Sequence, residues 1–454
     1  MDTDEIGSIN NDDYIETIEN EEDVDYSEDR ELVGDSCSTK VLNSTEAPRD
    51  RYRMVYFLFY LFGITSLVPW NFMITANDYW MYKFRDTTPH NLTIFVRKTQ
   101  FQTEFTSYLN VATAIPNLIF LVLNSLYGHW VSVKCRLQGS LIVVTLAFLV
   151  TTAFVQVDTD EWQNTFFIIT MVTVVIMTAA SAIFIGGIVG IASKFSEEYM
   201  TAVISGQSLG GIIAAIAQVI SLAFKISPLH SALIYFCIAD FVVIASLLSY
   251  MLLYRIDFFT HHVFRGSGLA VNRHRDASIK TILRKIWVYA FSIFAVFGIS
   301  MAVYPAVTVL VESHPSTAGT DWNNIFFVPV VNYLIFNCGD YAGRLISGFL
   351  LRPKNQYIIA AASILRVIGV PMLMVCNAQP RSHLPVIFPY DYEYIAIMVV
   401  FAITNGYLCN IVMINSTQIV EVHEKEKASS VIATMLSVGL TVGAAVGMLL
   451  VRLL

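Results

Sequence analysis

Charged residues are scarce in this chain. They make up 14% of its 454 residues, whereas 55% of the residues are hydrophobic. Soluble globular domains carry about 25% charged residues, so the composition argues against a soluble protein. The chain also lacks the GxxxxGK[ST] loop of ATP-driven pumps and the HExxH motif of zinc proteases. We therefore expect neither an enzyme nor a pump that binds ATP in such a loop, and no cofactor.

The cysteines do not indicate a disulfide framework or a metal site either. The six cysteines are Cys37, Cys135, Cys237, Cys338, Cys376 and Cys409. Most of them fall in the acidic N-terminal segment or within hydrophobic stretches, and no spacing suggests a disulfide framework or a zinc site. We interpret them as small packing residues and expect no bound metal.

Apolar stretches of about 20 residues, long enough to cross a bilayer as a helix, recur along the chain. Lipid cannot satisfy backbone polar groups, so such stretches are expected to be helical. The predicted spans are Tyr52–Ala76, Phe105–Tyr127, Leu137–Val155, Phe166–Ala192, Met200–Phe224, Ser231–Tyr254, Ile286–Val311, Ile325–Leu351, Tyr357–Cys376, Tyr394–Val420 and Ala428–Leu453. The sequence thus predicts an all-α membrane protein with eleven transmembrane helices.

Acidic residues are concentrated at the N-terminus. Residues 1–50 hold 17 acidic and 3 basic residues, and the remaining chain holds 19 acidic and 25 basic residues. This segment combines few apolar residues with high net charge, so we expect a disordered tail. It lacks the basic and apolar regions of a signal peptide. A mildly basic membrane body follows, with the lipid bilayer as its surroundings and no nucleic acid as an expected partner.

The loops predict an orientation. Fourteen Lys and Arg residues lie in loops on the side of the N-terminus and seven lie on the other side, which favours a cytoplasmic N-terminus. The sequon at Asn91 falls in the first outside loop and predicts glycosylation there. An odd number of helices then leaves the C-terminus outside. We favour the plasma membrane, with an endosomal or lysosomal membrane as the alternative because residues 28–33 form an imperfect acidic dileucine signal.

The longest inside loop predicts a division of the membrane body. The basic cytoplasmic loop 255–285 separates an N-terminal six-helix bundle, residues 51–254, from a C-terminal five-helix bundle, residues 286–454. Two bundles joined in this way commonly rock against each other around a site at the membrane midplane.

Three polar residues in the eighth span are the main candidates for such a site. Asn337, Asp340 and Arg344 are spaced three and four apart, so they share one helical face. A charge at bilayer depth costs about 2.5–3.5 kcal/mol on insertion scales, and intramembrane charges often mark solute pathways. The functional interpretation is a charge pair that binds a hydroxylated solute. The alternative is an ion pair that only joins helices.

Other polar and small residues allow the same two interpretations. Asn117 either lines the pathway or forms a bond between helices, and Trp70 beside Asn71 offers either a stacking face or an interfacial anchor. Glycines at spacing four, such as Gly206 with Gly210 and Gly439 with Gly443 and Gly447, predict close helix packing, and Gly211 lies directly beside the first pair. The glycines singled out for this role are Gly206, Gly211, Gly439, Gly443 and Gly447.

An ordered set of motifs extends through the membrane body. It comprises Asp50-Arg51-Tyr52, Pro69-Trp70-Asn71, Ser205-Gly206-Gln207, Tyr304-Pro305-Ala306, Phe336-Asn337, Asp340, Gly343-Arg344, Asn405-Gly406-Tyr407 and Gly439-Leu440. From about residue 50 to its end, the chain resembles the equilibrative nucleoside transporters.

The resemblance implies a fold like the major facilitator superfamily, in a six-plus-five arrangement. It implies energy-independent exchange of nucleosides, and in some members nucleobases, by alternating access. Asp340 and Arg344 match positions that contact the ribose in the family, and Asn337 lies beside them. Further positions match pocket residues: Leu67, Trp70, Asn71, Asn117, Tyr304, Tyr333 and Leu440. A position that carries glutamine in the best-known member is Ile185 in this chain, which leaves base selectivity open.

The sequence leaves alternative functions open. An organic-cation or monoamine carrier of the same family would need an unpaired acid in the pathway. A proton-influenced nucleoside carrier would use acidic pH to tune Asp340. A membrane receptor or scaffold would instead recruit partners through the acidic tail. The oligomeric state is not predicted by the sequence.

Overall fold

The helices of the computed structural model follow the predicted hydrophobic stretches. The structure describes residues 48–86, 99–268, 278–314, 319–350, 353–379, 381 and 383–454. Eleven helical segments among these residues are long and apolar enough to cross a membrane, and no strand forms in the described part of the chain. The predicted all-α fold with eleven spans is therefore confirmed. The sequon at Asn91 and most of the acidic tail, residues 1–47, lie outside the described residues.

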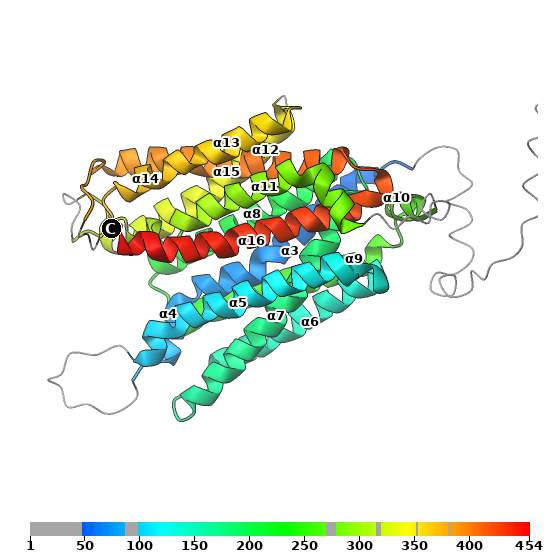
Figure 1. Cartoon of the computed structure of the whole chain (residues 1–454). Helices are drawn as coiled ribbons and strands as arrows, with labels where there is room; N and C mark the ends of the chain where they lie inside the picture. Colours follow the sequence, from blue (N-terminus) through cyan, green and yellow to red (C-terminus); the bar gives the residue numbers. More distant parts are fainter. Residues whose placement is uncertain are drawn as a thin grey trace, which may run out of the picture. The chain divides into compact units, whose positions relative to one another are not determined.

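The helices, labelled as in Figure 1, follow one another along the chain with only short connections between most of them. They are α3 (Met54–Thr75), α4 (Asn77–Lys83), α5 (Gln100–Tyr127), α6 (Val133–Gln156), α7 (Gln163–Ala192), α8 (Glu197–Ala223), α9 (Pro228–Leu253), α10 (Asp257–Gly268), α11 (Ile279–Val303), η6 (Trp322–Phe326), η7 (Val328–Leu334), α12 (Ile335–Phe349), α13 (Gln356–Leu365), η8 (Arg366–Ile368), α14 (Gly369–Met374), α15 (Asp391–Gln418), η9 (Val422–Glu424) and α16 (Lys425–Arg452), together with the short turns η2 (Arg51–Arg53), η3 (Gly128–Trp130) and η4 (Thr308–Leu310).

Three spans differ from simple α-helices for local reasons. The eighth span begins with the wide π-type turns η6 and η7, and Pro329 lies at the start of η7, where its missing N–H cannot close an ordinary helical bond. The ninth span narrows to a short 3₁₀ segment at Arg366. The seventh begins at Ile279, earlier than predicted, because Arg284 and Lys285 extend the helix toward the membrane surface.

The helices associate in two groups. In Figure 1, α5, α6, α7 and α9 lie on one side, and α11, α13, α15 and α16 lie on the other. The most extensive packing pairs α3 with α8 in the first half of the chain, and α11 with α16 and α12 with α15 in the second half. Helices α8 and α12 pack across the groups, as do α5 and α16. The polar side chains of the candidate site lie at this crossing.

Small residues permit the closest of these contacts. A Cβ atom added at Gly443 of α16 would lie 2.4 Å from the Gly298 carbonyl oxygen of α11, and one at Gly206 of α8 would lie 2.3 Å from the Tyr60 carbonyl oxygen of α3. Gly439 and Gly447 face α11 in the same way. Backbones that approach this closely require glycine, which is how small residues join helices in lipid.

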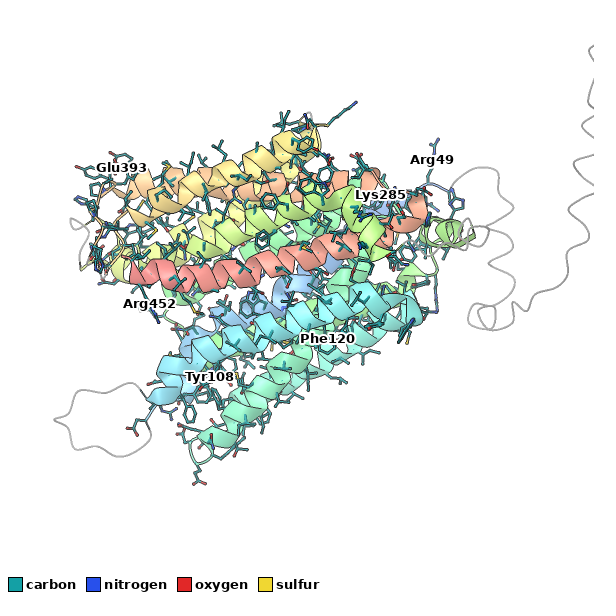
Figure 2. The ribbon with its side chains drawn as sticks, in the orientation of Figure 1. Arg49, Tyr108, Phe120, Lys285, Glu393 and Arg452 are labelled. Atoms are coloured by element: carbon teal, nitrogen blue, oxygen red, sulfur yellow. The ribbon has the colours of Figure 1, made fainter. Side chains whose placement is uncertain are left out.

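Charged side chains mark the two ends of the helices. Figure 2 shows Arg49 and Lys285 at one end and Glu393 and Arg452 at the other. Large apolar side chains such as Phe241, which is 73% exposed, cover the sides between these ends. An apolar girdle between two polar ends is the surface that a bilayer requires.

Candidate functional site: a buried charge network between the helix groups

Asp340 and Arg344 form an ion pair within α12. Their spacing of one helical turn places the Arg344 guanidinium beside the Asp340 carboxylate, with 2.9 Å between Nη2 and Oδ2. Asp340 is 4% exposed and Arg344 is 5% exposed. A buried ion pair is stable only when additional hydrogen bonds satisfy its remaining donors and acceptors. The neighbouring helices supply several of these bonds.

Helix α12, which carries the ion pair, packs on α15 of the second group, and helix α8 packs on α3 in the first half of the chain. Helix α8 therefore covers the ion pair from the first group. Ser208 donates a hydrogen bond to Oδ2 of Asp340. Nη1 of Arg344 donates to the carbonyl oxygen of Ile204 and to Oε1 of Gln207, the latter over 3.3 Å. The ion pair therefore holds the two groups together in this conformation.

Helix α15 completes the network from the other side. Asn405 donates from Nδ2 to Oδ1 of Asp340 over 2.7 Å. The Oδ1 atom of Asn405 accepts hydrogen bonds from Ser300 (2.7 Å) and from Nη1 of Arg366 (3.0 Å). Two donors at Oδ1 fix the amide orientation, so Nδ2 must point toward the carboxylate. Asp340 is thus the acidic residue of this network. It pairs directly with the guanidinium group of Arg344 and is linked to that of Arg366 through Asn405.

Sequence reasoning identified only part of this network. Arg366 and Gln207 stand out as polar residues within spans, but the sequence suggests no partner for either. Ser208 and Asn405 were missed as partners of Asp340, because contacts between distant helices leave no local signal. Ser208 lies in a GxSxG pattern, Gly206–Gly210, but it sits within α8 and donates to Asp340 rather than occupying the strand-to-helix turn of a hydrolase nucleophile.

Asn337 lies at the same crossing, one turn before Asp340. Its Nδ2 donates to the Tyr333 carbonyl oxygen over 2.9 Å. A Cβ atom added at Gly211 of α8 would lie 2.3 Å from Oδ1 of Asn337. Gly211 therefore serves the contact between the helix groups, whereas the glycines of α16 serve packing within one group.

Aromatic rings lie next to these polar residues. Tyr304, at the end of α11, stacks on Phe336 with ring centroids 3.8 Å apart, and meets Tyr333 edge-on at 6.4 Å. Phe336 and Tyr333 belong to the same two turns of the eighth span as Asn337. The structure thus brings Tyr304, Tyr333 and Asn337 to one region.

The remaining predicted site residues lie farther from the ion pair. Asn117 of α5 donates to Ser437 of α16 over 2.9 Å, so it links the two groups in this conformation. The half-buried residues of α3 and α16 form no hydrogen bond or ring contact with the described side chains of the network; these residues are Leu67, Trp70, Asn71 and Leu440.

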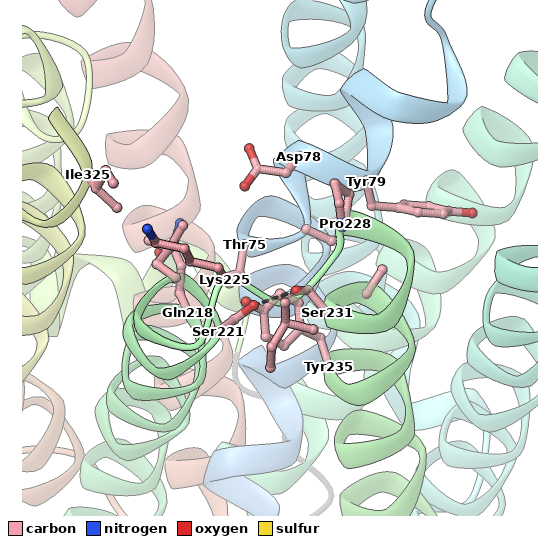
Figure 3. Close-up of a pocket in the computed structure, with 14 residues that line it drawn as sticks. Thr75, Asp78, Tyr79, Gln218, Ser221, Lys225, Pro228, Ser231, Tyr235 and Ile325 are labelled. Atoms are coloured by element: carbon pink, nitrogen blue, oxygen red, sulfur yellow. Dashed lines mark hydrogen bonds between the residues drawn. The ribbon is translucent and has the colours of Figure 1, made fainter. Parts of the chain in front are cut away.

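The ion pair is covered in this conformation. Helices α8 and α15 enclose it, and a cavity of about 270 Å³ lies elsewhere, near the ends of α3 and α8 (Figure 3). A solute would reach Asp340 and Arg344 only after α8 and α12 separate. The arrangement therefore requires a change of conformation for any role in binding. In the described part of the chain, no cluster of His, Cys, Asp and Glu could hold a metal ion.

A second set of charges links the groups at the end where α3 begins and α9 ends. Glu426, in the first turn of α16, accepts from Arg136 of α6 over 3.2 Å and from Lys194, just after α7, over 2.9 Å. All three side chains are less than a third exposed. One carboxylate thus clamps two helices of the other group. Glu424, two residues earlier, pairs instead with Lys285 of its own group at 2.7 Å.

Removing the charge of Glu426 is expected to weaken the contact between the two helix groups at this end of the helices. Glu426→Gln leaves Arg136 and Lys194 without their acid, and partly buried pairs of this kind contribute about 1 kcal/mol each. We expect a Ser430→Cys side chain, buried one turn farther along α16, to react several-fold faster with a thiol reagent applied from the N-terminal side. Glu424→Gln is the matched control. Equal labelling of the two variants would show that Glu426 does not hold the groups together.

Comparison with solved structures places this fold in a known class. The chain is similar to the crystal structure of the major facilitator superfamily transporter FucP in the outward conformation. The TM-score is 0.54, with 14% identity over 88% of this chain and 98% of that chain. The fold is therefore all-α and like that of the major facilitator superfamily, with two groups of helices.

Comparison with related sequences identifies the family. The family model described as Nucleoside transporter matches residues 171–277 and 270–452. The chain is 32% identical to "Equilibrative nucleoside transporter 1" of Rattus norvegicus, over 90% of this chain and 99% of that protein. It is 30% identical to the Homo sapiens protein of the same name, over 89% and 98%. The chain belongs to the equilibrative nucleoside transporter family, as its motifs predicted. These relatives are named as transporters, which agrees with the expectation of a non-enzyme.

Proposed function

We propose that this chain is a facilitative carrier that moves nucleosides across a membrane by alternating access. The observation that carries the proposal is the buried Asp340–Arg344 pair, which lies where the two helix groups cross and is completed by both. Charges at membrane depth persist where they serve a pathway. The family relation supplies the class of solute.

The chemistry of a nucleoside suits these residues. Its ribose hydroxyls are costly to bury without partners, and a carboxylate beside a guanidinium offers an acceptor and donors at one place. Its base has flat faces that suit aromatic rings such as Tyr304 and Trp70. When α8 moves away, Arg344 loses its bonds to Ile204 and Gln207, and those N–H groups become free for the solute. Nucleobases are further candidate substrates.

The motion that we propose is rocking of two bundles, residues 51–254 and 286–454. Contacts such as Glu426 with Arg136 would hold the N-terminal end closed while the other end opens. The charge bias of the loops supports a cytoplasmic N-terminus and an external C-terminus. We favour the plasma membrane over an endosomal or lysosomal membrane because the acidic dileucine signal at residues 28–33 is imperfect.

The organic-cation alternative is less well supported by this geometry. An organic cation needs an acid without a counter-charge at the midplane, and Asp340 is bound to Arg344, Ser208 and Asn405. A proton-influenced carrier would show uptake that changes with pH across the membrane, and uptake into liposomes measures this directly.

Purified protein in liposomes tests the function. We expect labelled uridine and adenosine to enter until their inside and outside concentrations are equal, with no dependence on sodium or proton gradients. Liposomes that contain an Asp340→Ala, Arg344→Ala or double-neutral variant serve as controls for leakage. Liposomes that stay impermeable to every nucleoside would overturn the proposal.

A further inference from the structure

A cavity of about 270 Å³ lies well away from the Asp340–Arg344 pair (Figure 3). Its walls come from the end of α3, the short helix α4, the end of α8 and the start of α9. Ile325 of η6 contributes from the other helix group. The cavity thus lies between the groups, at the end of the molecule where α4 and the C-terminus are found in Figure 1. A solute that approaches the crossing of α8 and α12 from this end would meet the cavity first.

The polar lining offers both acceptors and donors. Asp78 of α4 supplies a carboxylate, and Lys225, in the turn after α8, supplies an ammonium group. Figure 3 shows both above the hydrogen-bonded hydroxyls of Ser221 and Ser231. Neither Asp78 nor Lys225 forms an ion pair within the described residues, and both are exposed. Gln218 adds an amide with one acceptor and two donor hydrogens.

The rest of the cavity lining includes aromatic and aliphatic side chains. The ring of Tyr235 is buried at 4% exposure and lines the cavity with Leu222 and Ile325. Tyr235 stacks on Phe72 of α3 at 5.9 Å, which fixes its position. A volume of about 270 Å³ falls just below the roughly 300–1,000 Å³ of typical small-molecule sites. The cavity therefore has room for about one small solute.

The position of Asp78 is held by its helix. Trp80 of α4 donates from Nε1 to the Met73 carbonyl oxygen over 3.0 Å, and Lys83 donates to the Val157 carbonyl oxygen over 2.6 Å. Burial lowers the pKa of Lys83, and nearby Asp158 and Asp160 oppose that shift. Because α4 is tied to both α3 and the turn after α6, the carboxylate is presented on a rigid wall.

We propose that this cavity is a second binding site, at which a nucleoside docks before it reaches the Asp340–Arg344 pair. Asp78 accepts from the ribose hydroxyls, Lys225 and Gln218 donate to the polar edge of the base, and Tyr235, Leu222 and Ile325 pack against its apolar surface. An occupant contacts both helix groups at once, which couples its arrival to their movement. This inference rests on the proposed function.

Substrate protection of an introduced cysteine tests the site. Thr75→Cys places a thiol in the cavity at a lining residue that has no assigned role in binding, and His230→Cys places one on the exposed start of α9, outside the lining. Both variants are treated from the C-terminal side with a charged methanethiosulfonate that does not cross membranes. Labelling at each position is followed by mass spectrometry, so the exposed native cysteines Cys135, Cys237 and Cys338 do not interfere. We expect uridine to slow labelling of Thr75→Cys at least about threefold and to leave labelling of His230→Cys unchanged.

A second arm separates this site from the ion pair. In the Asp340→Asn/Arg344→Gln background, which leaves no buried charge unpaired, we expect translocation to be lost while uridine still protects Thr75→Cys. Protection that disappears in the Asp340→Asn/Arg344→Gln background, or that never occurs in the wild-type background, overturns the second site. Either result leaves uridine flux through the wild-type protein intact, so failure of the cavity is distinguishable from failure of the carrier function.

Discussion

Removing both charges of the Asp340–Arg344 pair together is expected to abolish uptake of nucleosides while the protein still folds. A single substitution leaves one buried charge unpaired, at a cost of about 3–5 kcal/mol. Loss of uptake could then result from misfolding rather than from loss of solute binding. Asp340→Asn with Arg344→Gln keeps polar side chains of similar size and leaves no orphan charge. Hydrogen bonds to charged groups contribute about 1.5–3 kcal/mol each, so losing two of them lowers uptake at least about 100-fold.

The amount of protein at the cell surface is the necessary control for this variant. Labelled uridine uptake is divided by the surface-biotinylated amount, and Lys354→Gln, which neutralises an exposed charge just before α13, provides a control variant outside the network. Normal uptake by the double variant at normal surface levels would mean that the pair only joins α12 to its neighbours.

Gly406→Ala is expected to destabilise the protein strongly. A Cβ atom at this position of α15 would lie 1.9 Å from the Asp340 carbonyl oxygen of α12, a backbone atom that cannot rotate away. Overpacking costs about 1–3 kcal/mol where side chains adjust, and a backbone clash reaches the upper end of that range or beyond. The two helices must separate, and Asn405 then loses its bond to Asp340. We expect a clear fall in Tm and loss of uptake.

Gly348→Ala is the matched control for that experiment. It lies on α12, and an added Cβ meets no heavy atom within 4 Å. Thermal unfolding in detergent, followed by light scattering or tryptophan fluorescence, compares the two variants directly. A Gly406→Ala protein as stable and active as Gly348→Ala would contradict the close approach of α12 and α15.

The fold was largely predictable because its signals are local. Each span is a run of apolar residues, and the bilayer sets the required length. The misplaced ends have local causes as well: α11 begins at Ile279 because Lys and Arg side chains extend from its first turns to the membrane surface, and α10 forms within the loop predicted for residues 255–285.

The site was predictable only along its own helix. Asn337, Asp340 and Arg344 share a helical face, which spacing alone reveals. Ser208 and Asn405 come from helices about 130 and 65 residues away along the chain. Nothing in a local pattern marks a serine or an asparagine as the partner of a distant aspartate. The clamp at Glu426 was missed for the same reason, because its partners lie on α6 and beyond α7.

Counterflow in liposomes tests the central claim most directly. Liposomes that contain the purified protein are loaded with unlabelled uridine and diluted into a trace of labelled uridine. If the solute docks at Asp340 and Arg344 during alternating access, the wild-type protein gives a transient accumulation of label and the Asp340→Asn/Arg344→Gln protein gives none. A double variant that accumulates label as fast as an equal amount of wild-type protein would contradict the account.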